Sequence, residues 1–250
     1  MTLSEKTWKK YIEKLRKINE KAAQLMEEYL ATHNVNTKEG RKAMLDYAYS
    51  LATSFGEGSA ELACQMYDAT AEMSGVALPT AEPAPTATYK DVAVAVQGEM
   101  LRTDDIEVIA SAVSRLVKMA GADTTMQNAL RDGAEFAWIP SGDTCPYCMM
   151  LASRGWQKAS KNAIKHGHAE HIHANCDCTY QIRFDGRSTV EGYDPEALYK
   201  EYASGGNTPR ERLNAMQRKY YAENRDVINA QKREAYRKRK EAESVNEPSE

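Results

Sequence analysis

The clustering of cysteine and histidine constrains this chain more than any other feature of its sequence. The chain has five cysteines and five histidines, and eight of these ten residues fall within 34 positions, from Cys145 to Cys178. Even scatter over 250 residues would place between one and two of them there. A cluster of this kind is typical of a metal site, a disulfide framework or thiol chemistry.

The spacing within the cluster favours a structural zinc site. Cys145-Pro-Tyr-Cys148 is a C-x2-C pair, and His173-Ala-Asn-Cys176-Asp-Cys178 supplies a second group of donors. Zinc prefers four nitrogen or sulfur ligands in a tetrahedron. The cluster offers five candidate ligands, one more than the four that zinc needs, so one of Cys176 and Cys178 is a candidate not to bind the metal. The predicted ligands are therefore Cys145, Cys148, His173 and one or both of Cys176 and Cys178.

Three interpretations of the cysteines without zinc stay open. In the first, the cysteines are reduced and buried thiols, since unpaired cysteine is among the most buried residue types. In the second, they form disulfides, if the mature protein lies in an extracellular particle. In the third, Cys145 and Cys148 are the dithiol of a thiol-disulfide oxidoreductase. The third follows from the C-P-Y-C sequence of glutaredoxins. Glutaredoxins also carry a Thr-Val-Pro segment, whereas this chain has Thr189-Val190-Glu191 and no sign of their four-stranded sheet.

A zinc deaminase is a further enzymatic alternative. His168-Ala-Glu170 matches the H-x-E element of these enzymes, and a C-x2-C pair is present. In deaminases, however, H-x-E precedes P-C-x-x-C, and here the order is reversed. His166, His168 and His171 are therefore expected to face solvent, and we expect no enzymatic activity.

Composition excludes several classes of protein. Lys and Arg number 33 against 36 Asp and Glu, a net charge of −3, so no overall basic field indicates nucleic-acid binding. A mean hydropathy of −0.65 and the absence of a long apolar run argue against a membrane span and against membrane partners. The charged start of the chain does not resemble a secretory signal, so synthesis in a reducing cytoplasm is expected.

Apolar periodicity predicts a mainly α-helical chain with a small α+β module. Apolar residues recur at three- and four-residue steps from Trp8 to Leu30, which predicts a long helix over 5–32. A short strand is predicted from Glu135 onward, and the alternation of Tyr180, Ile182 and Phe184 predicts a second one. The two strands flank the cysteine cluster and could pair. The sequence FGEGS is expected to break a helix at 55–59. Further helices are predicted at 38–55, 59–74, 89–101, 104–120, 124–133 and 209–241.

Four regions follow from this pattern. Residues 1–75 form a helical N-terminal region, and 76–88, with three prolines, form a linker or a strap across the surface. Residues 89–190 form the module that holds the Cys/His cluster. Residues 191–250 comprise a basic helix and an acidic tail.

The stretch from Asp143 to Phe184, together with Gly192-Tyr193-Asp194-Pro195, resembles a known family. The shared elements are the C-x2-C pair, the glycine at Gly155 and the His-x2-Cys-x-Cys element. They are similar to those of the phage Mu F-like head morphogenesis proteins, the minor head proteins of tailed bacteriophages, in the branch from siphophages of Gram-positive hosts. Ala174 stands where the family usually has proline, and Asp177 where it usually has arginine.

The resemblance implies a non-enzymatic virion component. Such a protein is made in the host cytoplasm and lies inside the head near the portal vertex. It takes part in head assembly and in DNA packaging or ejection. Its implied partners are the portal protein, the major capsid or scaffold protein, and packaged double-stranded DNA.

The predicted C-terminal helix supplies a candidate DNA-binding element. Residues 210–241 carry eleven basic and five acidic side chains, a net charge of +6, with tyrosines interleaved. Such a segment neutralises phosphates without reading base sequence. A solvated helix with mixed charges, or one that contacts an acidic face of the portal protein, is the alternative. The predicted DNA-binding residues are Arg233, Arg237, Lys238, Arg239 and Lys240.

Overall fold

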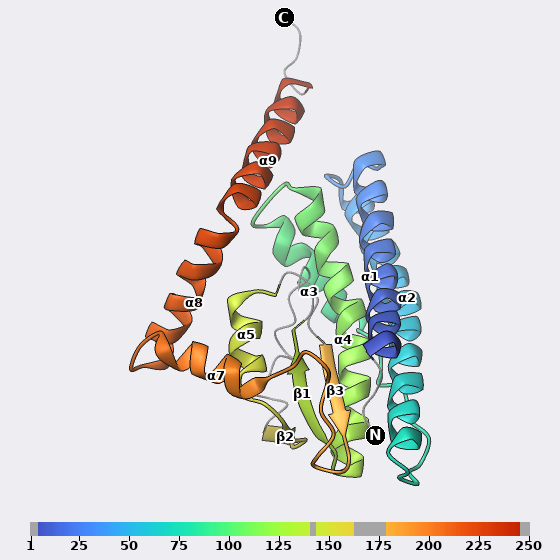
Figure 1. Ribbon diagram of the computed structural model, residues 1–250. Coiled ribbons are helices and arrows are strands. Elements are labelled where there is room, and N and C mark those ends of the chain that lie inside the picture. Colours follow the sequence, from blue (N-terminus) through green and yellow to red (C-terminus); the bar gives the residue numbers. More distant parts are fainter. Residues whose placement is uncertain (1–4, 141–143, 163–178, 246–250) are drawn as a thin grey trace, which may run out of the picture.

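The computed structural model describes residues 5–140, 144–162 and 179–245, and it is mainly helical with one small antiparallel sheet (Figure 1). This confirms the predicted fold class. The elements are α1 (Glu5–Thr32), α2 (Lys38–Met73), α3 (Tyr89–Met100), α4 (Ile106–Asp132), β1 (Glu135–Ile139), α5 (Pro146–Ala152), β2 (Gln157–Lys158), β3 (Thr179–Arg183), α7 (Pro195–Ser204), α8 (Pro209–Glu223) and α9 (Arg225–Val245). None of the described helices is long and apolar enough to cross a membrane.

Helix α4 is the centre of the helical body. It packs against α1, α2 and α3, and its C-terminal half also contacts the sheet (Figure 1). Two apolar clusters lie along it: one joins α1 and α2 to α3 and contains Met26, Met44 and Val113, and the other joins α1 and α2 to the sheet and contains Tyr67 and Trp138. The apolar face predicted for the first helix is buried or half-buried throughout, which confirms that prediction.

The predicted break at FGEGS is wrong, because α2 continues from Lys38 to Met73. Gly56 and Gly58 lie inside the helix, and Gly56 is buried against the methyl group of Thr86, which a Cβ at Gly56 would approach to 3.1 Å. The break predicted after residue 120 is also absent. A Cβ at Gly121 of α4 would lie 2.6 Å from the Ser59 hydroxyl of α2. Gly56 and Gly121 therefore allow close packing, which outweighs their low helix propensity.

The Pro-rich segment 76–88 is a strap held against α2 and α4, one of the two forms that its sequence left open. The Asn128 side chain accepts from the Glu82 amide at 3.0 Å and donates to the Glu82 carbonyl at 2.8 Å. The Ala84 amide donates to the Thr124 hydroxyl, and the Ala81 amide to the Asp68 carboxylate. Helices before and after the strap consequently share both apolar clusters.

The sheet follows α4 directly. Gly133 adopts the left-handed conformation (φ 67°) that ends α4, and β1 starts two residues later. The strand order is β2-β1-β3, and β1 pairs with β3 in antiparallel register from Glu135↔Arg183 to Ile139↔Thr179. This confirms the predicted strand pair. At one end of the pair, Arg183 Nε lies 2.6 Å from Glu135 Oε2, and the Arg183 guanidinium also stacks on the Trp156 ring.

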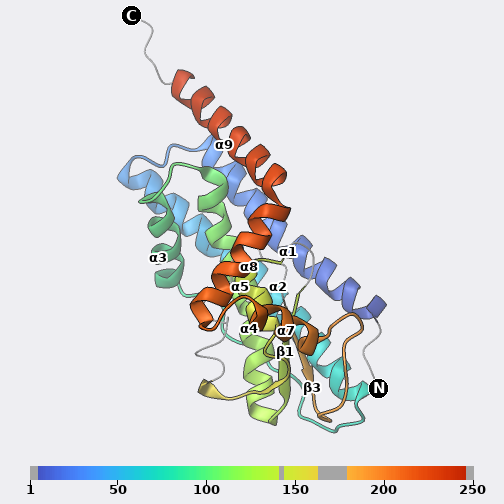
Figure 2. The same cartoon turned by 60° about the vertical axis from the view of Figure 1, so that its left-hand side comes forward.

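The C-terminal basic segment forms two helices, α8 and α9, where one helix over 209–241 was predicted. The interruption is at Asn224, whose side-chain amide donates to the Tyr220 carbonyl at 3.0 Å. Asparagine often competes with the helical backbone in this way. Figures 1 and 2 show α9 leading away from the helical body. Among the described elements, α8 is the one with which α9 makes its main contact.

Candidate functional site

The C-x2-C pair lies at the beginning of α5. Cys145 is the residue before the first helical turn, with φ −65° and ψ 154°, and Pro146 occupies the first helical position. Proline is favoured there because its missing N–H has no helical partner anyway. Cys145 is half-buried, whereas Cys148 is 1% exposed. Neither cysteine is in a disulfide with a described cysteine.

Residues 192–195 pack on the opposite end of α5. The buried Tyr193 hydroxyl donates to the Ala152 carbonyl, the last residue of α5, at 2.6 Å. Burial raises the pKa of Tyr193 to about 12, so the hydroxyl stays protonated and keeps donating. Gly155 has φ +68°, and a Cβ there would lie 3.3 Å from Pro195 Cβ. The short helix with the cysteines is thus fixed between β1 and the start of α7.

The same four residues also start α7. Gly192 has φ 78°, which favours glycine, and Pro195 is the first helical residue. The Asp194 carboxylate accepts from the amides of Glu196 and Ala197 at 3.0 Å and so caps the helix. Each residue of the Gly-Tyr-Asp-Pro segment therefore has a structural role. Helix α7 was missed in the sequence, although an Asp-Pro pair is a signal for a helix start.

The predicted second half of the metal site, His173, Cys176 and Cys178, lies outside the described residues. The described neighbours show how it connects: β3 begins at Thr179, and Thr179 pairs with Ile139, the last residue of β1. The chain segments that carry the two halves of the motif thus connect to the same end of the β1–β3 pair. In the part of the chain that the structure describes, no three His, Cys, Asp or Glu side chains form a metal-binding group.

Cys64, the cysteine outside the cluster, is a core residue of α2. It is 5% exposed and belongs to the apolar cluster that contains Trp8 and Tyr11. Burial, together with the nearby carboxylates of Glu61 and Asp68, raises the pKa of the Cys64 thiol to about 11. A thiol that stays protonated at neutral pH is a poor nucleophile and a poor metal ligand.

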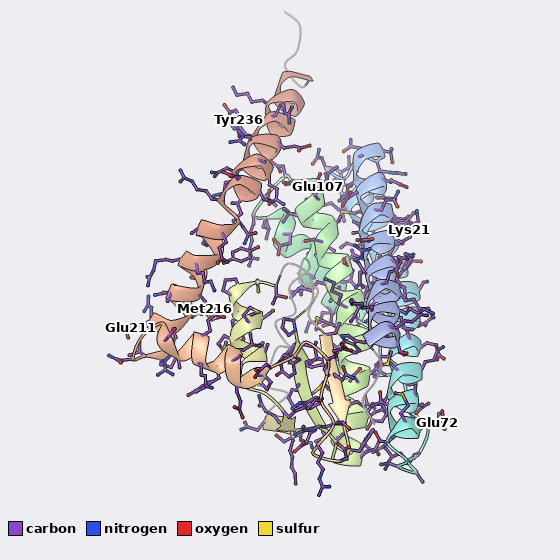
Figure 3. All side chains as sticks on the ribbon, viewed as in Figure 1. Lys21, Glu72, Glu107, Glu211, Met216 and Tyr236 are labelled. Atoms are coloured by element: carbon purple, nitrogen blue, oxygen red, sulfur yellow. The ribbon has the colours of Figure 1, made fainter. Side chains whose placement is uncertain are left out.

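The predicted DNA-binding residues all belong to α9. Arg233, Arg237 and Lys240 are exposed, and Lys238 and Arg239 lie on the same helix. Tyr236 is 65% exposed, and Figure 3 shows it on the side of α9 away from the helical body. The helix therefore presents cationic and aromatic groups to solvent.

The comparisons with known proteins identify a family. The sequence model described as VG15 protein matches residues 2–205, which span α1 to the end of α7. The chain therefore belongs to the VG15 protein family. No curated protein and no solved structure matches it.

Proposed function

We propose that this chain is a minor head protein of a tailed bacteriophage, a non-enzymatic virion component inside the head near the portal vertex. The observation that carries this proposal is the assembly of three of the resembling elements, the C-x2-C pair, Gly155 and the Gly-Tyr-Asp-Pro segment, into one unit. The C-x2-C helix α5 is held at its end by Tyr193, and Gly155 contacts Pro195. The Gly-Tyr-Asp-Pro segment serves this packing and the start of α7, which favours a structural role over catalysis.

The proposed partners are the portal protein and the major capsid or scaffold protein, with packaged DNA as the third neighbour. The test is mass spectrometry of purified virions from a genome that encodes this chain. We expect the chain in few copies relative to the portal protein, and portal recovered after cross-linking. Virions that lack the chain, or a chain found in the host cell alone, would contradict the proposal.

We further propose that Cys145, Cys148, His173 and one or both of Cys176 and Cys178 hold a structural Zn²⁺. The two thiols at the start of α5 suit this metal, because paired thiolates with this spacing are common zinc ligands. A bound zinc would join the segment after β1 to the segment before β3 and so stabilise the module.

Metal analysis tests the zinc site. The purified chain should contain about one zinc per chain. Cys145→Ser or Cys148→Ser should lose it, whereas Cys64→Ser should retain it because Cys64 lies in the helical core. A metal-free chain whose Cys145 and Cys148 exchange disulfides with glutathione would instead support the oxidoreductase alternative.

We propose, finally, that α9 binds duplex DNA without sequence preference. Its support is the exposed cationic surface of a helix that packs against little else. If about five phosphates are contacted, log affinity should fall against log salt with a slope of about −4 to −5. Changing Arg237, Lys238, Arg239 and Lys240 to Gln should weaken binding and flatten this slope. Lys6, Lys9, Lys10 and Lys14 of α1, changed to Gln, form the matched control, and equal losses from both sets would contradict the assignment.

A further inference from the structure

A groove lies between α2, the strap and the start of α3. It is lined by one face of α2 and by residues 83–89, and about 680 Å³ of it is open to the centres of water-sized spheres. Ligand sites in proteins commonly measure about 300–1,000 Å³. Two exposed tyrosines contribute to the lining, Tyr49 of α2 and Tyr89 of α3, and their ring centroids lie 5.5 Å apart, edge to face. The groove therefore has room for side chains of another molecule and offers them aromatic rings.

The groove is acidic. All of its described lining residues belong to the segment 43–89, which contains six Asp and Glu and no Lys, Arg or His. Glu57 and Glu61 of α2 line the groove and are exposed. Glu61 accepts from the Gln65 amide at 3.1 Å, and Glu57 has no hydrogen-bond or ion-pair partner in the part of the chain that the structure describes. Exposed carboxylates beside exposed aromatic rings favour a cationic occupant.

Helix α9 carries an exposed cationic face. Its members recur at three- and four-residue steps, so they share one side of the helix, and all four are exposed: Arg233, Tyr236, Arg237 and Lys240. Figures 1 and 2 show α9 leading away from the helical body, and no described residue of α9 lines the groove of its own chain. This face is therefore open to another molecule.

The charges of the groove and of α9 match in spacing as well as in sign. Glu57 and Glu61 are four residues apart on α2, and Arg233 and Arg237 are four residues apart on α9. Each pair therefore spans about 6 Å along its helix. Two helices lying side by side can thus form both ion pairs at once.

We propose that α9 of one copy of this chain docks in the groove of a second copy. Arg233 pairs with Glu61 and Arg237 with Glu57, which makes the two helices antiparallel. Lys240 then lies toward Tyr49, whose ring attracts a cation. Pairing of two α9 helices is disfavoured, because each carries seven basic and four acidic side chains. The contact does not depend on the proposed DNA binding, and it is measured without nucleic acid.

Sedimentation velocity of the full-length chain tests the contact. A small, charged contact should give weak self-association, with a dissociation constant of about 10–100 µM. Glu57→Lys with Glu61→Lys should weaken it about tenfold or more, and so should Arg233→Glu with Arg237→Glu. The matched control is Glu72→Lys with Glu191→Lys. It makes the same charge change at exposed carboxylates that do not line the groove, and it should leave self-association unchanged.

A mixture of the two charge-reversed variants identifies the surfaces that meet. All four reversed positions are exposed, so both variants should keep the melting temperature of the parent chain. In an equal mixture, the reversed groove of one variant meets the reversed α9 of the other, and the unchanged groove meets the unchanged α9. Association should therefore return to within about threefold of that of the parent chain.

Three results would overturn the proposal. The first is a parent chain that stays monomeric up to about 300 µM, well above the expected dissociation constant. The second is undiminished self-association of the groove variant. The third is a mixture of the two variants that sediments no faster than its separate components.

Discussion

At the scale of single residues, buried polar side chains hold segments that lack regular structure. Asn128 is 1% exposed and pairs with both backbone groups of Glu82 in the strap. The Tyr193 hydroxyl likewise joins the segment before α7 to the end of α5 by a hydrogen bond. A buried hydrogen bond of this kind contributes about 1 kcal/mol net, and losing one partner leaves the other unpaired.

Tyr193→Phe should lower the free energy of unfolding by about 1 kcal/mol, because it removes the short hydrogen bond to the Ala152 carbonyl, which then keeps only the Gly155 amide as a donor, at 3.2 Å. Tyr199→Phe is the matched control, since Tyr199 is 52% exposed in the neighbouring helix and should change stability little. Urea denaturation measures both. Equal effects from the two variants would remove the structural role assigned to Tyr193.

Asp123 should make stability depend on pH. Burial raises the pKa of the Asp123 carboxyl to about 6, above its unfolded value of 3.8. The folded chain therefore binds more protons than the unfolded chain between about pH 4 and pH 6, so this group lowers stability as the pH rises through that window. Asp123→Asn should be about 1–2 kcal/mol more stable than the parent at pH 7 and similar to it near pH 4. Urea denaturation of the parent and of Asp123→Asn across this pH range measures the difference in their free energies of unfolding. Asp226→Asn in α9 is the exposed control. A difference between the parent and Asp123→Asn that is the same at all pH values would contradict the assignment.

At the scale of elements, the sequence predicts those helices and strands whose formation depends on residues close together in the chain. The face of α1, the β1–β3 pair and the helix start at Cys145 were predictable because periodicity, alternation and proline placement act within a few residues. The continuity of α2 and α4 was not predictable, because Gly56 and Gly121 are tolerated through distant partners, Thr86 and Ser59. The buried side-chain oxygens of Asn19 and Thr179 that lack hydrogen-bond partners were not predictable from the sequence either, since the cavity that both residues line is formed by segments far apart in the chain.

Replacing a helical glycine with alanine should lower stability where the glycine is in close contact with another helix, and raise it where the glycine has open space beside it. Gly121→Ala places a Cβ 2.6 Å from the Ser59 hydroxyl and 3.2 Å from its carbonyl oxygen, which should cost about 1–3 kcal/mol of stability. Gly98→Ala in α3 meets nothing within 4 Å and should stabilise by about 0.5–1 kcal/mol. Thermal and urea unfolding of both variants give the signs, and stabilisation by both would argue against the close α2–α4 crossing.

At the scale of the whole molecule, a packed body carries a projecting arm. The body is built around α4, while α8 contacts α5 and α9 packs against α8 (Figures 1 and 2). A helix with few tertiary contacts opens at little cost in free energy. The strap of residues 76–88, in contrast to α9, is held firmly, and it joins the helices before and after it into one body.

Brief exposure to trypsin should therefore cut α9 first. Its basic residues between 225 and 240 are the expected sites, and Arg131 at the end of α4 is the internal control that should stay intact. The remaining fragment should melt within about 2 °C of the full chain, because α9 adds little to the core. Loss of the body at the same rate as α9 would show that the arm is part of the cooperative unit.

The central position of α4 also sets the order in which the chain gains its structure during synthesis. Helices α1 and α2 leave the ribosome first, yet both bury much of their apolar surface against α4, which ends at Asp132. Until that residue has emerged, the nascent chain exposes apolar side chains of two long helices, such as Met26 and Tyr67. The first half of the chain is thus a natural client for chaperones, and the module with the cysteines forms on a body that α4 has just completed.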